Sequence, residues 1–292
     1  MNDPATRHLP TTLPQPFAIV GAGRLGTAIA GALRGSGIDV SGPHGRGYDG
    51  RTPSSGIDAV VLFCVPDDAI AAAADLVVPG PLLGHCSGVS TLDVLGGREA
   101  FSLHPLLTVT GPGTQFQGVW AAAAGNTENA VGVAEQLADV LGLRAVEVAD
   151  ADRAAYHAAA SFAANFLVTV ESAAAELMAT AGMDREVLLP LARAALENWG
   201  RLGPAALTGP VARGDTGTVA RHRAAVQSRT PELAELFEVL VSATERLGAR
   251  RSIGDPIQSE ATSADHGTSG AHHSGDGRTA RDRPADDVES TT

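Results

Sequence analysis

Short apolar runs alternate with polar, glycine-rich or helical segments along the first half of the chain. Such runs, bounded by glycine and proline, are typical of buried strands, and strands that alternate with helices favour a parallel sheet. We therefore expect an α/β domain over residues 16–149. Between Gly42 and Gly56 the chain is so rich in glycine that we expect a loop in place of the usual helix. The expected strands are Phe17–Val20, Ile38–Ser41, Ala59–Val65, Leu82–Cys86, Ala100–Leu103, Val119–Ala123 and Arg144–Val148.

The pattern changes after Ala149, where apolar residues recur at helical spacing. Residues 152–180 are rich in alanine and contain neither Pro nor Gly, and Gly182 is placed to end a long helix. Further helices are expected near residues 184–199, 216–227 and 231–247. We therefore expect a second, all-helical domain over residues 150–250.

Both ends of the chain lack the apolar residues that a folded core needs. Residues 1–15 are polar and proline-rich and read as a flexible leader. Residues 251–292 consist mainly of Ser, Thr, Gly, Asp, His and Arg. Such a segment buries too little apolar surface to offset its chain entropy, so we expect a disordered tail.

Composition narrows the class of protein. The net charge of −12 disfavours nucleic-acid surfaces and anionic membranes as partners. The two cysteines, Cys64 and Cys86, lie in apolar strand-like surroundings and are expected to be buried free thiols in a reducing compartment. No span suggests a transmembrane helix, so we expect a cytoplasmic protein, and we expect no metal site. The chain contains no lysine, which excludes any mechanism that needs a lysine of its own.

A glycine motif follows the first expected strand: Gly21, Gly23, Arg24, Leu25 and Gly26 lie in a turn that opens a helix. The first glycine permits a tight turn, the second lets backbone approach a pyrophosphate, and the third lets the helix pack close to the strand. The N-terminus of the helix offers free N–H groups to phosphates. This arrangement predicts a dinucleotide site.

The end of the second expected strand bears on which dinucleotide binds. NAD sites usually place an acidic residue there, on the ribose 2′-hydroxyl. Here Asp39 lies within the strand, and Ser41, His44 and Arg46 follow with donors and positive charge. This favours a 2′-phosphate, and hence NADP(H) over NAD(H). The alternative is a solvated polar loop.

Two later strand ends are expected at the same edge of the sheet. The backbone of Val65 and Pro66 would line the nicotinamide ribose. His104 ends another strand and precedes a proline. Carboxyl ends of parallel strands face the ligand crevice, which makes His104 a catalytic candidate. A buried histidine that is hydrogen-bonded internally is an equal alternative.

The long helix carries a polar stripe. His157, Ser161 and Asn165 are spaced i, i+4 and i+8 among Ala and Phe. Polar groups in apolar surroundings are either paired internally or line a cavity, and three in a row favour the cavity. In a later Gly/Pro loop, Thr208 and Arg213 are candidates to bind substrate, with Arg213 clamping a carboxylate. Alternatively, Arg213 pairs with an aspartate and only holds the loop.

Taken together, five motifs resemble one family, the Rossmann-like proteins with a DUF2520 domain. The resemblance spans about residues 16–248 and implies a Rossmann domain followed by a helical domain like that of 6-phosphogluconate dehydrogenase. Some members resemble alternative ketopantoate reductases, and others are described as NADP-dependent oxidoreductases. Related enzymes use a Lys and an Asn on the first helix of the helical domain; Asn165 matches the Asn, and no lysine is present. The motifs are Gly-Ala-Gly-Arg-Leu-Gly, Phe-Cys-Val-Pro-Asp-Asp, Leu-His-Pro-Leu, Tyr-His-Ala-Ala-Ala-Ser-Phe-Ala-Ala-Asn-Phe and Ala-Leu-Thr-Gly-Pro-Val-Ala-Arg-Gly-Asp.

The sequence thus predicts an NADPH-dependent reductase of a small 2-keto acid, with ketopantoate as the first substrate to test. His157 would donate the proton, Ser161 and Asn165 would hold the reacting oxygen, and His104 would lie against the nicotinamide. Two alternatives stay open: another NADP oxidoreductase, of the imine reductase or prephenate dehydrogenase type, and a non-catalytic dinucleotide sensor. We also expect a homodimer formed through the helical domain.

Overall fold

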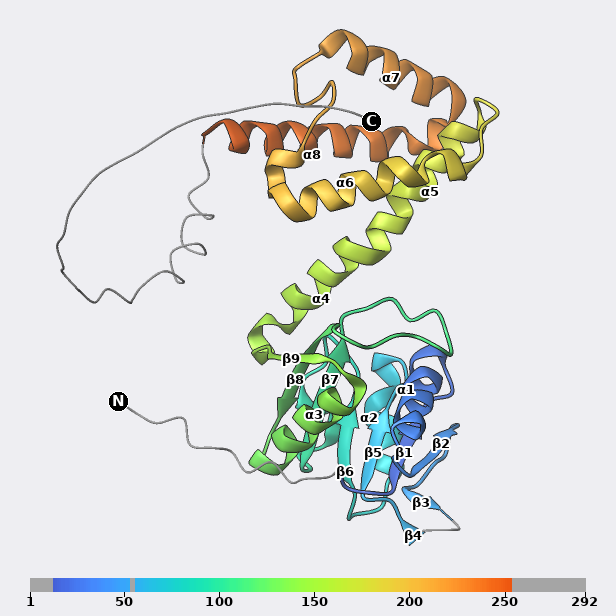
Figure 1. Ribbon diagram of the computed structural model, residues 1–292, viewed down its shortest axis with the longest axis vertical. Helices are drawn as coiled ribbons and strands as arrows, with labels where there is room; N and C mark the ends of the chain where they lie inside the picture. Colours follow the sequence, from blue (N-terminus) through green and yellow to red (C-terminus); the bar gives the residue numbers. More distant parts are fainter. Residues whose placement is uncertain (1–12, 53–55, 254–292) are drawn as a thin grey trace, which may run out of the picture. The chain divides into compact units, whose positions relative to one another are not determined.

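A computed structural model describes residues 13–52 and 56–253 of the chain, which divides into two compact units, Met1–Ala174 and Ala175–Thr292 (Figure 1). The expected tail lies outside the described residues, apart from residues 251–253, and so does most of the expected leader. The order of elements confirms the expected fold class, an α/β region followed by helices.

All seven expected strands form and build one sheet in the order β2-β1-β5-β6-β7-β8-β9. Neighbouring strands are parallel except β7 and β8, which run antiparallel with Phe101 opposite Gly125. The expectation of a wholly parallel sheet is therefore wrong at this pair. Residues 106–119, which join the two strands, form no helix, and only a parallel pair requires a long crossover. The strands are β1 Phe17–Val20, β2 Val40–His44, β5 Val60–Phe63, β6 Leu82–His85, β7 Ala100–Pro105, β8 Trp120–Gly125 and β9 Arg144–Glu147.

Helices cover both faces of this sheet. Helices α1 (Arg24–Gly35) and α3 (Glu128–Leu141) bury their apolar sides on one face, and α2 (Ile70–Leu76) packs on the other. Each face of the sheet has its own apolar core, and alternate residues of β1 point into one or the other. Phe17 belongs to the core under α1 and α3, and Ala18 belongs to the core under α2. This is the period of two that a strand dictates.

The glycine-rich segment after β2 contains no helix in its described part, as expected. It forms a short antiparallel pair, β3 (Arg51–Thr52) with β4 (Gly56–Ile57). The second strand, however, begins at Val40 and runs to His44, later than expected. His44 therefore lies within β2 rather than in the loop after it, and Ser41 lies near the start of the strand rather than at its end.

The second half of the described chain is helical. Helix α4 (Arg153–Ser161) continues through a π-helical turn at Phe162–Phe166 into α5 (Leu167–Ala179). Gly182 follows with a φ of 76°, the left-handed conformation expected for a residue that ends a helix. The remaining helices are α6 Leu189–Leu202, α7 Thr216–Arg229 and α8 Ala234–Ile253.

The long helical stretch corrects one expectation. The segment Asp150–Ala179, 30 residues, is long and apolar enough to cross a membrane by length and composition alone, although we expected no such span. One such helix is weak evidence, since helices of soluble proteins pass the same test. Near its start, Arg153 is fully buried and hydrogen-bonds to Ser102 of the sheet, which ties this end of the helix to the α/β region.

Candidate functional site

The glycine turn between β1 and α1 is closely packed at its two ends. Gly21 has a φ of 113°, and a Cβ added there would lie 2.3 Å from the carbonyl oxygen of Cys64. A Cβ on Gly26 would lie 2.0 Å from the carbonyl oxygen of Gly21. These contacts give both glycines the packing roles expected from the sequence, because no side chain fits at either position.

The middle of the turn is open. Gly23 is exposed, precedes α1 with an ordinary φ of −74°, and has no atom within 4 Å of where a Cβ would be. No side chain caps α1, and its first turn contains no acidic residue. The N–H groups and the positive dipole end of α1 are thus offered without competition to an anion. This geometry fits the pyrophosphate of a dinucleotide.

At the end of β2, the polar residues expected to read a 2′-phosphate form an internal network. Ser41 Oγ donates to Asp58 Oδ1 at 3.3 Å and lies 3.1 Å from His44 Nε2, while the His44 ring stacks on Tyr48 at 3.9 Å. Tyr48 also donates to Asp58, which is buried. Burial lowers the pKa of His44, so the exposed Arg46 is the group in this set that brings positive charge.

The ends of β5 and β6 adjoin the glycine turn. Cys64 and Cys86 are free thiols with their sulfur atoms 3.8 Å apart. Cys86 is buried as expected, whereas Cys64 is partly exposed, and a hydrogen bond with Cys64 together with burial raises the pKa of Cys86. Val65 Cγ1 would lie 3.2 Å from a Cβ on Gly21, and Pro66 is exposed. Val65 therefore borders the turn, and Pro66 follows Val65 in the chain.

Three aromatic side chains meet near the carboxyl ends of β6 and β7; we call His104, Tyr156 and His157 the imidazole cluster. His104 Nδ1 lies 2.9 Å from the Tyr156 hydroxyl, and the rings of His104 and His157 are 5.7 Å apart between centroids. Gly88 makes room for them, since a Cβ there would lie 2.7 Å from His157 Cδ2 and 2.9 Å from His104 Nε2. The structure thus brings together two of the predicted catalytic residues.

The surroundings of the cluster keep His104 neutral. Burial, His157 and the Arg153 guanidinium lower the pKa of His104 to about 4, with a smaller opposing effect from Asp67. Burial raises the pKa of Tyr156 above its ordinary value. At neutral pH the pair is therefore a protonated phenol beside an uncharged imidazole. The uncharged His104 can donate and accept hydrogen bonds, but its pKa is too low for it to act as a proton donor near pH 7.

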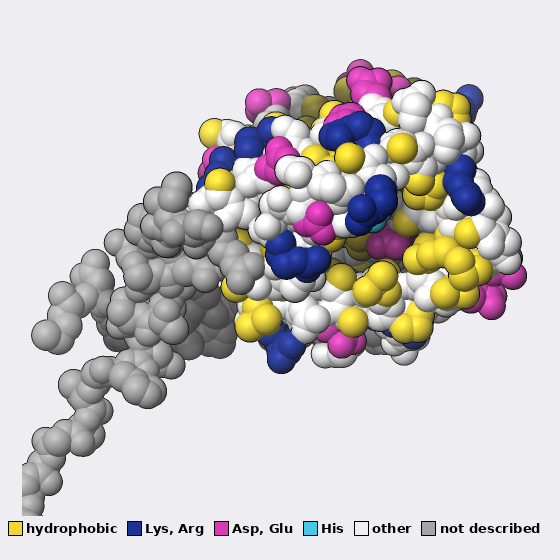
Figure 2. All heavy atoms as spheres, turned by 90° about the horizontal axis from the view of Figure 1, so that it is seen from above, with side chains coloured by type: hydrophobic (Ala, Val, Ile, Leu, Met, Phe, Trp, Pro, Cys, Tyr) yellow, Lys and Arg dark blue, Asp and Glu magenta, His cyan; other side chains and the backbone are white. Residues whose placement is uncertain are grey.

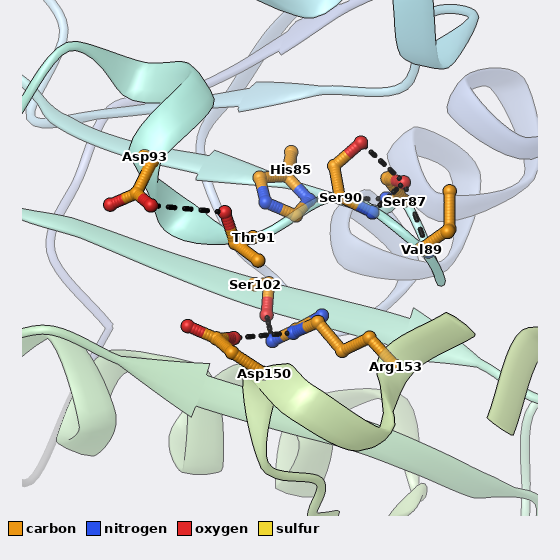
Figure 3. Close-up of polar contacts among 9 residues, drawn as sticks. All are labelled: His85, Ser87, Val89, Ser90, Thr91, Asp93, Ser102, Asp150 and Arg153. Atoms are coloured by element: carbon orange, nitrogen blue, oxygen red, sulfur yellow. Dashed lines mark hydrogen bonds and ion pairs between the residues drawn. The ribbon is translucent and has the colours of Figure 1, made fainter. Parts of the chain in front are cut away.

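A buried cation, Arg153, lies between Asp150 and Ser102 (Figure 3). Arg153 is 1% exposed; its Nε donates to Asp150 Oδ1 at 2.9 Å, and its Nη2 donates to Ser102 Oγ at 2.7 Å. Ser102 is the cross-strand neighbour of His85. Arg153 Nη1 and His85 Nε2 are both buried without a hydrogen-bond partner in the described part of the chain.

His85 belongs to the same electrostatic environment. Its Nδ1 accepts a hydrogen bond from the Ser87 amide at 3.2 Å (Figure 3). Burial and Arg153 lower the pKa of His85 to about 4, so it too is neutral. Ser87 Oγ in turn accepts a hydrogen bond from the Ser90 amide at 2.9 Å.

The polar stripe on the long helix is only partly regular. Ser161 Oγ donates to the backbone carbonyl of His157 at 3.2 Å, one turn back. Asn165 lies in the π-helical turn and is exposed, so the α-helical spacing used to predict the stripe does not hold between Ser161 and Asn165. Their contact with a reacting oxygen stays a prediction.

The predicted substrate-binding residues belong to the second compact unit. Thr208 and Arg213 are exposed in the loop before α7. Asp215 caps α7 by accepting a hydrogen bond from the Thr218 amide at 2.9 Å. The roles of Thr208 and Arg213 in binding a substrate stay predictions.

Sequence reasoning missed one member of the imidazole cluster, Tyr156, and three residues near it: His85, Gly88 and Arg153. Two of them carried a signal. Arg153 lies one helical turn before His157, and Tyr156 precedes it directly. His85 and Gly88 could be found only through the pairing of β6 with β7, which sequence pattern does not reveal. In the described residues, no group of three or more His, Cys, Asp or Glu is placed to hold a metal ion.

The sequence and the fold both resemble those of known proteins. Residues 119–244 match the family model described as "Domain of unknown function (DUF2520)". This part of the chain is a DUF2520 region, and the sheet has a Rossmann-like fold. The match begins just before β8, so this DUF2520 region includes the last two strands of the sheet as well as helices. No curated protein matches the sequence.

Solved structures share the fold of this chain. A candidate NADP oxidoreductase from Bacteroides fragilis has a TM-score of 0.68 at 22% identity, covering 80% of this chain and 98% of its own. A protein from Thermotoga maritima has a TM-score of 0.68 at 20% identity, covering 80% and 100%. A reductive aminase from Aspergillus terreus, solved with NADPH and ethyl levulinate, has a TM-score of 0.62 at 16% identity, covering 83% and 99%. These likenesses establish the fold.

Proposed function

We propose that this protein is an NADP-dependent reductase. One observation carries the proposal: the open, uncapped start of α1 at Gly23 and the imidazole cluster lie at the same edge of the sheet, because β1, β5, β6 and β7 are parallel. The two sites are three strand spacings apart along this edge, roughly 14 Å. Open α/β sheets bind dinucleotides across such an edge. The neighbours described with NADP or NADPH support the choice of cofactor.

The adenosine half of the cofactor would meet the end of β2. We assign the 2′-phosphate to the exposed guanidinium of Arg46 and the hydroxyl of Ser41, with Arg24 on the glycine turn as a further cation. His44, whose pKa is lowered, would contribute a hydrogen bond rather than a charge. NADP(H) is therefore favoured over NAD(H) in this proposal.

For the substrate we propose a small 2-keto acid, with ketopantoate the first to test. The bound nicotinamide would supply the hydride. Reduction of a carbonyl leaves an alkoxide that needs a proton, which we assign to His157. His104, Ser161 and Asn165 would hydrogen-bond the reacting oxygen. Thr208 and Arg213, which belong to the other compact unit, stay predicted carboxylate ligands, with a guanidinium suited to a bidentate fork.

Imine reduction is the second candidate. It is favoured by the likeness to the Aspergillus terreus reductive aminase. The same edge of the sheet would serve, since reduction of an iminium also takes a hydride and a neutral imidazole can bind an amine product by hydrogen bonds.

The experiment follows NADPH oxidation by the purified full chain with a panel of 2-keto acids and cyclic imines. Turnover of a 2-keto acid is the expected result, and His157→Ala should lower kcat by ~10²–10⁴. His222→Ala, which changes an exposed histidine of α7, is the matched control and should leave kcat unchanged. If NADPH binds but no 2-keto acid is reduced, the substrate assignment is wrong, and turnover of imines would select the second candidate.

We further propose that the protein is a homodimer through its helical unit. Among described residues 175–253, only three apolar side chains are buried: Val219, Val226 and Val241. Large ones such as Leu191 and Trp199 are 69% and 62% exposed, and hydrophobic side chains are open to view on the face in Figure 2. So much exposed apolar surface is typical of an interface. A second copy is the occupant we propose, because helices with so small a core need a partner to bury their apolar sides.

A further inference from the structure

Tyr156 and His104 form a hydrogen-bonded pair whose proton positions can be worked out. The Tyr156 hydroxyl is 2.9 Å from His104 Nδ1, and the two rings meet edge to face, at 83° and 5.6 Å between centroids. A neutral imidazole has one N–H donor and one acceptor nitrogen, so the partner at Nδ1 decides which nitrogen carries the proton. This pair thus sets what His104 presents on its other side.

The electrostatic surroundings supply both protonation states. His104 is neutral because it is buried beside His157 and the Arg153 guanidinium, and Tyr156 keeps its phenol proton because it is buried. The backbone of Ala122 has a smaller, opposing effect on the pKa of Tyr156. A protonated phenol has one O–H to donate, and Nδ1 of a neutral imidazole that carries its proton on Nε2 accepts it.

The opposite nitrogen of the ring lies against Gly88. A Cβ on Gly88 would lie 2.9 Å from His104 Nε2, so only glycine lets the imidazole pack this close. Within the described ranges, no residue hydrogen-bonds to His104 Nε2. His157 packs against the same glycine, with its Cδ2 2.7 Å from that Cβ position.

We propose that Tyr156 is the positioning residue of His104: its hydroxyl donates to Nδ1 and so holds His104 as the Nε2–H tautomer. The Nε2–H, on the side of the ring near Gly88 and His157, would be the hydrogen-bond donor for the carbonyl oxygen of the substrate. The last step rests on the proposed reductase function, and the tautomer does not. The arrangement separates two roles: His104 stabilises the developing negative charge, and His157 supplies the proton. A fixed donor of this kind is worth about 10²–10³ in rate.

The first arm of the test needs no substrate. The full chain, labelled with ¹⁵N in its histidine rings, is examined by NMR near neutral pH, and the His104 signals are identified by their loss in His104→Gln. We expect a proton on Nε2 and a hydrogen-bonded, unprotonated Nδ1, whose signal shifts in Tyr156→Phe. Tyr48→Phe is the matched control, because Tyr48 stacks on His44 and should shift only that residue's signals. A proton on Nδ1, or no response of Nδ1 to Tyr156→Phe, would overturn the proposal.

The second arm measures kinetics on whichever carbonyl substrate the enzyme reduces. Tyr156→Phe should lower kcat by about tenfold to hundredfold, the usual effect of a misplaced catalytic group, with KM changed by less than about twofold. His104→Gln, whose amide reaches nearer the place of Nε2, should retain more activity than His104→Asn. In the His104→Gln background, Tyr156→Phe should have no further effect.

The two arms fail separately. If the tautomer is as proposed but Tyr156→Phe leaves kcat unchanged, His104 does not contact the reacting oxygen, and the catalytic step of the proposal is wrong. If no substrate is turned over at all, the reductase function is at fault, while the NMR arm still decides the role of Tyr156.

Discussion

Replacing Gly26 by alanine tests the packing that creates the dinucleotide turn. The added Cβ would lie 2.0 Å from the Gly21 carbonyl oxygen, so the backbone must yield by at least about 1 Å before the contact reaches a tolerated distance. Overpacking usually costs about 1–3 kcal/mol, and this contact belongs at the upper end because no side chain can rotate away. Alanine recovers about 0.5–1 kcal/mol in helix propensity. The net loss is therefore about 2 kcal/mol, a fall in Tm of about 4–8 °C.

Thermal and urea unfolding of the full chain measure this loss, with Gly23→Ala as the matched control. Gly23 has no atom within 4 Å of its Cβ position and an ordinary φ, so alanine there should leave the free energy of unfolding within about 0.5 kcal/mol of wild type. If Gly26→Ala has the same Tm as the wild type, or if Gly23→Ala loses as much stability as Gly26→Ala, the reasoning about the turn is refuted.

Two further predictions concern pH and assembly. The pKa of His85 in the folded chain, about 4, lies below its ordinary value of 6.5, so the unfolded chain binds more protons between these two pH values. The contribution of His85 to stability is therefore present above pH 6.5 and is lost as pH falls toward 4, by about 3 kcal/mol. Urea unfolding across pH 4–7 should therefore be less pH-dependent in His85→Gln, and an identical slope would contradict this. For assembly, Leu191→Glu and Trp199→Glu should convert a dimer into a folded monomer by light scattering, whereas a wild type that is already monomeric would disprove the dimer.

The sequence was sufficient for the features that depend on local pattern. The strand alternation, the glycine turn and the long helix all follow from periodicity and from positions where only glycine fits. The antiparallel β8 could not be predicted this way, because apolar runs read the same in either direction. Nor could the shift of β2, which moves His44 into the strand, where it lies beside Ser41, which in turn donates to Asp58.

The candidate site was harder to predict for a related reason. His104 and His157 were identified separately, as a strand end and a helix position, and only the fold brings them together. The residues that tune them, Arg153 and Tyr156, act through contacts with residues more than 50 positions away. The π-helical turn that displaces Asn165 from the predicted stripe likewise leaves no sign in the polar pattern.

The central claim is that a dinucleotide binds at the open start of α1, and calorimetric titration of NADPH tests it most directly. The wild-type chain should bind one NADPH per chain. Gly23→Ala, a folded variant by the argument above, should bind at least about tenfold more weakly, a loss of about 1.4 kcal/mol, because its methyl group occupies the space where the phosphates approach. Equal affinity in the two proteins, or a wild type that binds no NADPH, would contradict the account.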